Sequence, residues 1–237
     1  MAWQLLVVNP NSSCSMTEAI AKRVAECDAF RVAKVHYMTG PSESPRQIDG
    51  VATSNASCEA CLRVLTDPGS EFYYSRFDGV LVACFSDHPL VAALAALPQA
   101  PLVVGLLDAC VSFAGLARKP FSIITSNAEW VEILDESVER EFLTGHLRSL
   151  WLGTVSSNLQ VLELHDETNF QKIVDVIRAE NVERLKSQYV ILGCAGFSGL
   201  EHRLNKIFEP NGVVFLDPIV IGFQTLLSSL TILQAMR

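Results

Sequence analysis

The chain has 237 residues, of which 49% are hydrophobic and only 19% are charged. A chain of this length and composition buries a large core, as one big domain or two small ones, and this excludes an intrinsically disordered protein. The net charge of −8, without a Lys/Arg cluster, argues against nucleic acid as a partner and favours a small molecule.

The start of the chain, Met1–Leu5, lacks the basic n-region and long apolar h-region of a secretory signal. No apolar run reaches the ~20 residues that a membrane span requires. Seven cysteines, an odd number scattered along the chain, fit reduced thiols better than a disulfide framework. We therefore expect a cytoplasmic protein with no membrane partner, in which some thiols are free to react.

In the first half of the chain, apolar runs alternate with helical stretches, as in a parallel α/β sheet. The run Leu5–Val8 predicts a strand, and Ser12 or Ser13 is expected to cap the next helix, with Glu18 early in it to suit the helix dipole. The segment Thr39–Pro45 is rich in turn formers and predicts a loop that could lie over a site. The other predicted elements are a helix to about residue 27, a strand at 31–37, a helix at 54–65, a strand before Cys84 and a helix at 89–97.

The second half shows the same alternation. The run Phe121–Ile124 predicts a strand that ends in hydroxyl and amide residues, and the run Val190–Leu192 predicts another that ends at Gly193-Cys194. Periodicity predicts helices at 128–142 and 169–186, and the apolar stretch 219–236 predicts a helix packed in a core or an interface. Together the elements indicate an α/β fold with doubly wound parallel sheets.

Three pairs of strand ends match between the two halves, which indicates a duplication. Each pair is separated by close to half of the chain length, so we expect two similar lobes with the site between them. The pairs are Leu5–Ser12 with Phe121–Asn127 at an offset of about 116 residues, Val80–Ser86 with Val190–Gly196 at 110, and Val103–Asp108 with Val213–Asp217 at 109.

The second pair carries a cysteine in each half, Cys84 and Cys194, at the strand end where α/β proteins place their chemistry. Two thiols can act as base and acid on opposite sides of a carbon beside a carbonyl. A helix N-terminus after each thiol would lower its pKa toward neutrality, and the amides that follow would bind an enolate oxygen. Such a reaction needs no metal and no organic cofactor.

Other readings of individual residues stay open at this stage. An isolated cysteine at a strand end is commonly a buried apolar residue, and Cys58-x-x-Cys61 is either helix packing or a redox or zinc half-site. His88 is either a turn residue or a residue at the site entrance. Asp108 and Asp217 are either helix N-caps or polar groups of the pocket.

The segments Val8–Ser13, Ala83–Asp87 and Leu192–Gly196 resemble, in this order and spacing, the hydantoin racemase branch of the aspartate/glutamate racemase superfamily. The resemblance covers almost the whole chain and is strongest to the fungal DCG1-like members, which are associated with allantoin and nitrogen catabolism. It implies two Rossmann-like lobes related by pseudo-twofold symmetry, with a site in the cleft between them. The implied lobes are residues 1–100 with 209–237, and residues 101–208.

The same resemblance implies a cofactor-independent racemase of 5-substituted hydantoins such as allantoin, in which Cys84 and Cys194 are the catalytic pair. It also implies a homo-oligomer. Where bacterial members have Asp-Pro-Gly after the first cysteine motif, this chain has Asp87–Leu90 with a histidine, so the substrate preference stays open. The residues that the resemblance assigns to substrate binding are Asn11, Ser12, Gly40, Pro41, Ser86, Thr125, Ser126, Ala195 and Gly196.

Two further classes of function are compatible with these residues. An amino-acid racemase or a maleate-isomerase-like enzyme would use the same lobes and thiols on open-chain acids, although the chain has no obvious basic cluster for two carboxylates. A non-catalytic protein would bind a nitrogen metabolite without turnover. Such a protein would be stabilised by its ligand but would not exchange the ligand's carbon-bound hydrogen with solvent.

Overall fold

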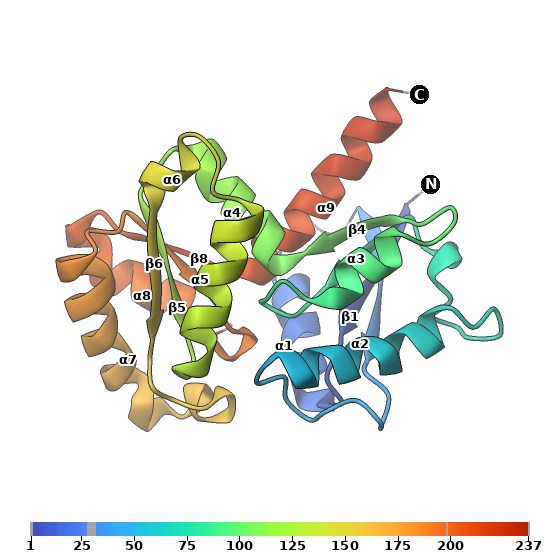
Figure 1. Cartoon of the computed structure of the whole chain (residues 1–237), viewed down its shortest axis with the longest axis horizontal. Helices are drawn as coiled ribbons and strands as arrows, with labels where there is room; N and C mark the ends of the chain where they lie inside the picture. The colour runs from blue at the N-terminus through green and yellow to red at the C-terminus, as the bar shows by residue number, and fades with distance from the viewer. Residues whose placement is uncertain (1, 28–31, 198, 237) are drawn as a thin grey trace. The chain divides into compact units, whose positions relative to one another are not determined.

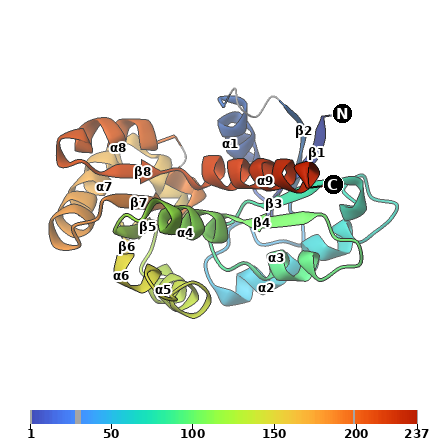
Figure 2. The same ribbon diagram turned by 90° about the horizontal axis from the view of Figure 1, so that it is seen from above.

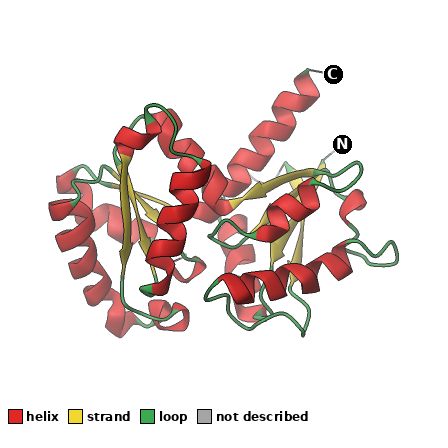
Figure 3. Ribbon diagram, in the orientation of Figure 1, coloured by secondary structure: helices red, strands yellow, loops and turns green. Residues whose placement is uncertain are grey.

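The computed structural model describes residues 2–27, 32–197 and 199–236, and the chain forms two compact units (Figure 1). Unit 1 comprises Met1–Ala109 with Ile219–Arg237, and unit 2 comprises Cys110–Pro218. Each unit contains a four-stranded parallel sheet with helices packed against it (Figure 3). The predicted α/β class with parallel sheets is therefore confirmed.

The sheet of unit 1 has the strand order β2-β1-β3-β4, and all three of its strand pairs are parallel. Its central strands are continuous apolar runs because they are covered on both faces: Leu5–Val8 and Val80–Val82 are at most 1% exposed. The elements of unit 1 are β1 (Trp3–Asn9), α1 (Cys14–Ala25), β2 (Ala33–Thr39), α2 (Val51–Leu65), η2 (Tyr74–Arg76), β3 (Gly79–Val82), α3 (Pro89–Ala95), β4 (Leu102–Gly105) and α9 (Pro218–Ala235).

The long apolar helix α9 packs against β3, and Figure 2 shows it beside this strand. A Cβ atom at Gly79 would come within 2.8 Å of the Leu226 side chain, and one at Gly222 within 3.0 Å of the Leu81 side chain. With 18 residues and a mean hydropathy of 1.4, α9 could cross a membrane by length and composition alone. This differs from the expectation that no apolar run is long enough to span a membrane. Its contacts with β3 are those of a core helix.

The sheet of unit 2 has the corresponding order β6-β5-β7-β8, again with parallel pairs. A separate apolar core surrounds it, which includes Ile124, Leu192, Phe197 and Phe208. The elements of the second half are α4 (Leu106–Ala117), β5 (Phe121–Thr125), α5 (Glu129–Glu141), α6 (Leu147–Leu150), β6 (Trp151–Ser156), η3 (Val161–His165), η4 (Glu167–Asn169), α7 (Phe170–Val176), the π-helical η5 (Ile177–Arg184), β7 (Tyr189–Leu192), η6 (Ala195–Phe197), α8 (Glu201–Phe208), η7 (Glu209–Asn211) and β8 (Val214–Leu216).

The free side of β8 is partly closed by a side chain. The Asn205 carboxamide accepts a hydrogen bond from Phe215 N at 2.8 Å and donates one to Phe215 O at 3.4 Å. This pairing imitates a neighbouring strand at the sheet edge, where unpaired main-chain groups otherwise invite another chain to pair.

The predicted lobe boundaries after residues 100 and 208 are earlier than those of the structure, which follow Ala109 and Pro218. Strand pairing explains both differences. β4 pairs with β3 and so belongs to unit 1, whereas β8 pairs with β7 and so belongs to unit 2.

Several local expectations also differ from the structure. Ser13 is the N-cap residue of α1, but its hydroxyl makes no capping bond and pairs with Ser15 Oγ instead, and Glu18 is outside the first turn. Several elements were not predicted, among them α4, β6 and α8. α4 begins directly after β4 without a polar break, so Leu106–Asp108 resembled a continuation of the strand. β6 contains Gly153 at φ +103° and a register shift, and α8 lacks a side-chain N-cap.

Candidate active site

In unit 1, the chemistry-bearing residues gather at the carboxyl ends of β2, β1 and β3. Ala83 N donates to Val8 O at 2.8 Å, which continues the β1–β3 ladder by one residue and brings Cys84 to the loop after β1. Gly40 N donates to Asn9 O at 2.7 Å and to Asn11 O at 3.0 Å. Parallel sheets bind ligands at this edge.

Asn9 organises the loop after β1 and is itself fully buried. Its Nδ2 donates to Asn11 Oδ1, Ser13 O and Thr17 Oγ1 at 3.0–3.1 Å. Asn11 Oδ1 also accepts from Ser13 N at 2.9 Å. The oxygen of the half-buried Asn11 is therefore occupied, and no hydrogen bond within the described residues uses its Nδ2. Asn9 therefore holds the loop in its conformation, whereas Asn11 has a side-chain donor available for a ligand.

The loop after β2 packs tightly on this framework. A Cβ atom at Gly40 would clash with the Pro10 carbonyl oxygen, so only glycine permits this approach. Ser12 N donates to Pro45 O at 2.9 Å, which joins the loops after β1 and β2 a second time. The predicted binding residues Asn11, Ser12, Gly40 and Pro41 thus lie in one region of unit 1.

Cys84 is half-buried, and its Sγ lies 3.5 Å from Ser86 Oγ. The expectation of a helix N-terminus directly after this thiol is wrong, because α3 begins only at Pro89. The amides after this thiol were expected to bind an enolate oxygen, but that of Ser86 already donates to Cys84 O at 3.1 Å. The Ser86 hydroxyl is a polar group that this loop places next to the thiol.

His88 does not stand at an entrance: it is 1% exposed and forms the N-cap of α3. Its Nδ1 accepts from Leu90 N at 3.2 Å, so the neutral ring carries its proton on Nε2, which donates to Ser57 Oγ of α2 at 3.0 Å. Ser57 Oγ in turn donates to Ser54 O at 2.8 Å. Burial lowers the pKa of His88 to about 4. The ring therefore ties the loop that carries Cys84 to α2.

In unit 2, the ends of β5 and β7 repeat the arrangement of β1 and β3. Gly193 N donates to Ile124 O at 2.8 Å, as Ala83 N does to Val8 O, and Cys194 follows at the same edge. Thr125 Oγ1 lies 3.5 Å from Gly193 O. The loop after β6 contacts the loop after β5, because the Ser157 hydroxyl donates to Ser126 O at 2.8 Å.

Cys194 differs from the expectation of a lowered pKa. Burial raises the pKa of its thiol to about 11, although the Gly196 N–H and the neighbouring Ser126 hydroxyl act in the opposite direction. Gly196 N donates to Cys194 Sγ at 3.4 Å, so this amide is used by the thiol rather than offered to an enolate. Only a three-residue 3₁₀ turn, Ala195–Phe197, follows the thiol. Cys194 is therefore protonated at neutral pH.

The remaining predicted residues of unit 2 surround this thiol. Gly196 packs so closely that a Cβ atom would lie 2.8 Å from Val161 O. The main chain of Ala195 opens the 3₁₀ turn, while its side chain is outside the described part of the structure. Asn127 Oδ1 is buried and has no hydrogen-bond partner within the described residues. Asn127 was not predicted as a site residue, although it belongs to the polar run after β5.

Strand register makes the duplication explicit. Val8 pairs with Val82 in unit 1, and Ile124 pairs with Leu192 in unit 2, which supports the predicted offsets of 116 and 110 residues. The third predicted offset is wrong, because the pairs Leu81 with Val104 and Ile191 with Leu216 give 112 rather than 109. Asp108 and Asp217 are therefore not equivalent: Asp108 lies in the first turn of α4, and Asp217 directly precedes α9.

The cysteine pair of α2 is part of the core. Cys58 and Cys61 are buried free thiols, and Cys61 Sγ donates to Pro10 O at 3.6 Å. Burial raises the pKa of Cys61 to about 11 and also raises that of Cys58, so neither is a ready thiolate. Within the residues that the structure describes, no group of three His, Cys, Asp or Glu side chains could hold a metal ion.

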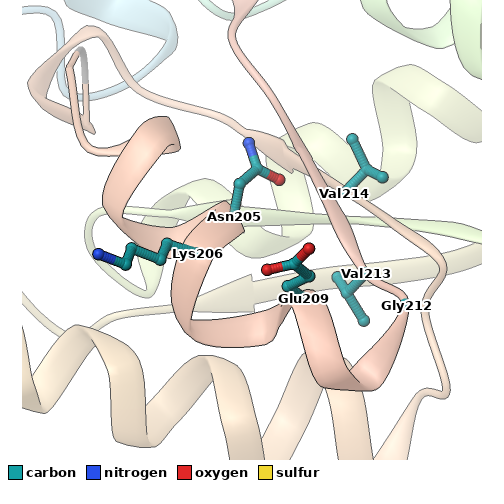
Figure 4. A pocket seen from close by; sticks show the side chains of 6 residues that line it. All are labelled: Asn205, Lys206, Glu209, Gly212, Val213 and Val214. Atoms are coloured by element: carbon teal, nitrogen blue, oxygen red, sulfur yellow. The ribbon is translucent and has the colours of Figure 1, made fainter.

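A separate open pocket of about 460 Å³ lies in unit 2 at the amino end of β8 (Figure 4). It contains no predicted site residue, and it lies at the start of a strand, whereas Cys194 follows the end of its neighbour β7. Its lining residues are Asn205, Lys206, Glu209, Gly212, Val213 and Val214.

Two parallel-sheet units with thiols at equivalent strand ends define a class of enzyme, and the sequence assigns the chain to it. The chain belongs to the Asp/Glu/hydantoin racemase family, whose model matches residues 5–226. Among its relatives, it is 49% identical to protein DCG1 of Saccharomyces cerevisiae over 100% of both chains. It is 28% identical to the hydantoin racemase of Paenarthrobacter aurescens, over 91% of this chain and 86% of that one.

A solved structure supports the fold. The allantoin racemase AllR from Pseudomonas fluorescens superposes with a TM-score of 0.78 and 21% sequence identity, over 97% of this chain and 91% of that one. At this identity the likeness concerns the arrangement of helices and strands.

Proposed function

We propose that this protein is a cofactor-independent racemase of 5-substituted hydantoins, with allantoin as the leading substrate. The observation that carries the proposal is the equivalence of Cys84 and Cys194, each two residues beyond paired residues of the same register in its own sheet. Its similarity to a named hydantoin racemase supports the choice of a hydantoin ring. A cytoplasmic location and a homo-oligomer stay predictions.

In the proposed mechanism, one cysteine thiolate removes the proton from C5 and becomes a thiol, leaving an enolate-like planar ring. The other cysteine, a thiol, gives its proton to the opposite face of C5 and becomes a thiolate. The product is the mirror-image ring, and the two cysteines have exchanged protonation states. For the other enantiomer the roles are reversed, as a two-base reaction requires.

The raised pKa of Cys194 favours its protonated form, so Cys194 is proposed as the acid, and Cys84 as the base, in one direction of the reaction. Ser86 Oγ, 3.5 Å from Cys84 Sγ, would donate to that thiolate. The proposal requires one substrate carbon to meet both thiols. It also requires polar groups for the ring carbonyl and N–H groups, and Asn11 Nδ2 is a candidate donor.

The test is the decay of circular dichroism of enantiopure allantoin and 5-benzylhydantoin in D₂O without added metal, with mass spectrometry for deuterium at C5. We expect decay with one deuterium incorporated, after correction for spontaneous racemisation. Cys84→Ser and Cys194→Ser should each lower kcat/KM by roughly 10²- to 10⁴-fold, because a hydroxyl is a far weaker acid than a thiol.

Cys14→Ser is the matched control, since this thiol is exposed and free. It should retain wild-type activity. Near wild-type racemisation by folded Cys84→Ser or Cys194→Ser would exclude the two-thiol mechanism. Stabilisation by a hydantoin without deuterium exchange would indicate a binding protein, and activity on open-chain acids alone would indicate an amino-acid racemase or a maleate-isomerase-like enzyme.

A further inference from the structure

The Asn127 carboxamide has a buried oxygen without a protein partner. The residue is 7% exposed, and its Nδ2 lies 3.5 Å from Gln160 Oε1. No described protein group donates to its Oδ1. Leaving a buried carbonyl unpaired is unfavourable, so native structures keep such groups when something else supplies the hydrogen bond.

The position of Asn127 shows where that partner would be. Asn127 follows β5 by two residues, at the same sheet edge as Cys194, because β5 and β7 are parallel neighbours. The adjacent Ser126 hydroxyl is buried and close enough to the Cys194 thiol to lower its pKa. An unpaired carboxamide oxygen next to this hydroxyl, at the edge that carries a candidate catalytic thiol, indicates the place of a polar ligand.

An unpaired oxygen alone would not carry this conclusion. Asn181 Oδ1 is also buried and unpaired, but the Asn181 side chain donates to Ser122 Oγ at 2.8 Å and to Ile123 O at 3.4 Å, along β5 rather than at its end. Asn181 is therefore a structural residue. Asn127 differs from it because it stands at the edge that carries the thiol.

The duplication gives Asn127 a counterpart. Val8 corresponds to Ile124 by strand register, so Asn11 and Asn127, each three residues further on, occupy equivalent positions in the two units. Asn11 has a side-chain donor available, whereas Asn127 has a side-chain acceptor available. Asn11 uses its Oδ1 within the loop, with Nδ2 outside the described hydrogen bonds, whereas Asn127 directs Nδ2 toward Gln160 and leaves Oδ1 unpaired.

We propose that Asn127 is a specificity-determining residue whose Oδ1 accepts a hydrogen bond from an N–H group of the substrate ring. This inference rests on the proposed function and names the group that the site selects. A hydantoin ring carries N–H groups beside its carbonyls, so it can satisfy this acceptor. A carboxylate has no proton to donate and would place a negative oxygen against a carbonyl oxygen. The residue therefore favours cyclic ureides and imides over dicarboxylic substrates.

The test combines two protein variants with three substrates: 5-benzylhydantoin and its N1-methyl and N3-methyl derivatives. Asn127→Leu removes the acceptor and keeps the branched shape and the number of side-chain heavy atoms. Gln160→Leu is the matched control, because it removes the partner of Nδ2 and keeps Oδ1. Thermal unfolding and far-UV circular dichroism check that both variants are folded, and Asn127→Ser replaces Asn127→Leu if the latter is not.

We expect the wild type to lose about 10- to 100-fold in kcat/KM on one methyl derivative, in which the recognised N–H is absent. Asn127→Leu should lose a similar factor on the parent ring, mainly through KM, and should lose little more on that derivative. Such non-additivity identifies the hydrogen bond. A purely steric effect of the methyl group would persist in the variant. Gln160→Leu should behave as the wild type.

Two results would overturn the inference, and they are distinguishable. If the wild type does not racemise 5-benzylhydantoin, the proposed function fails and this inference fails with it. Two outcomes with an active wild type would show that only the assignment of Asn127 is wrong. In one, Asn127→Leu has the wild-type kcat/KM on the parent ring. In the other, methylation lowers kcat/KM of the variant as much as that of the wild type.

Discussion

The buried ring of His88 makes the stability of the protein depend on pH in a defined window. Its folded-state pKa of about 4 lies below the ordinary value of 6.5, because burial disfavours the charged ring. Between these two pH values the unfolded chain binds a proton at this site and the folded chain does not. Stability therefore falls as the pH decreases from about 6.5 to about 4, and it is fully present above that range.

The expected loss of stability follows from the difference of about 2.5 between the two pKa values of His88. One pH unit corresponds to about 1.4 kcal/mol, so the full loss of unfolding free energy from this site should be about 3.5 kcal/mol. Protonation of Nδ1 would also remove the acceptor of the Leu90 amide and so weaken the start of α3.

The assay is urea denaturation at several pH values from 4 to 7.5, for the wild type and for His88→Asn. Asparagine can still cap α3 but does not titrate. Other titrating groups act equally in both proteins, so the difference between the two unfolding free energies isolates the histidine. A difference that stays constant from pH 7.5 to pH 4 would show that burial of this ring does not control its protonation.

Three further predictions follow from named contacts. Gly40→Ala should lower the free energy of unfolding by about 1–3 kcal/mol, measured by urea denaturation, because its methyl group meets the Pro10 carbonyl; unchanged stability would show that the loop can move. At pH 8, alkylation of Cys194 by iodoacetamide, followed by peptide mass spectrometry, should be about 100-fold slower than for a thiol of pKa 9, and it should accelerate up to pH 11; equal rates would contradict the raised pKa. Asn181→Ala should destabilise the protein by about 1–3 kcal/mol in urea because it breaks the bond to Ser122, whereas exposed Asn211→Ala should not.

All strands except β6, and both thiols, could be predicted from the sequence because they depend on local patterns. A strand buried on both faces is a short, continuous apolar run, and Val80–Val82 and Val190–Leu192 show this directly. A cysteine that directly follows such a run must lie at the carboxyl edge of the sheet, so its position in the sequence is enough to locate it.

Other features depend on contacts that a linear pattern does not contain. The lobe boundaries followed from strand pairing, which assigns Leu102–Gly105 to unit 1. The pKa of Cys194 depends on burial, which outweighs the Gly196 amide. The proposed role of Asn127 depends on which of its two polar atoms the protein already uses, and its place in a polar run was the only indication in the sequence.

The two units also differ in how their chain segments are connected. Unit 2 is one continuous segment, whereas unit 1 is completed by α9, which packs on β3 only after all of unit 2 has been synthesised. On the ribosome, the second sheet can therefore acquire all its own strands while one face of the first still lacks its helix. Contacts of such long sequence separation form slowly, so the protein depends on its last helix to bury the apolar surface of its first strands.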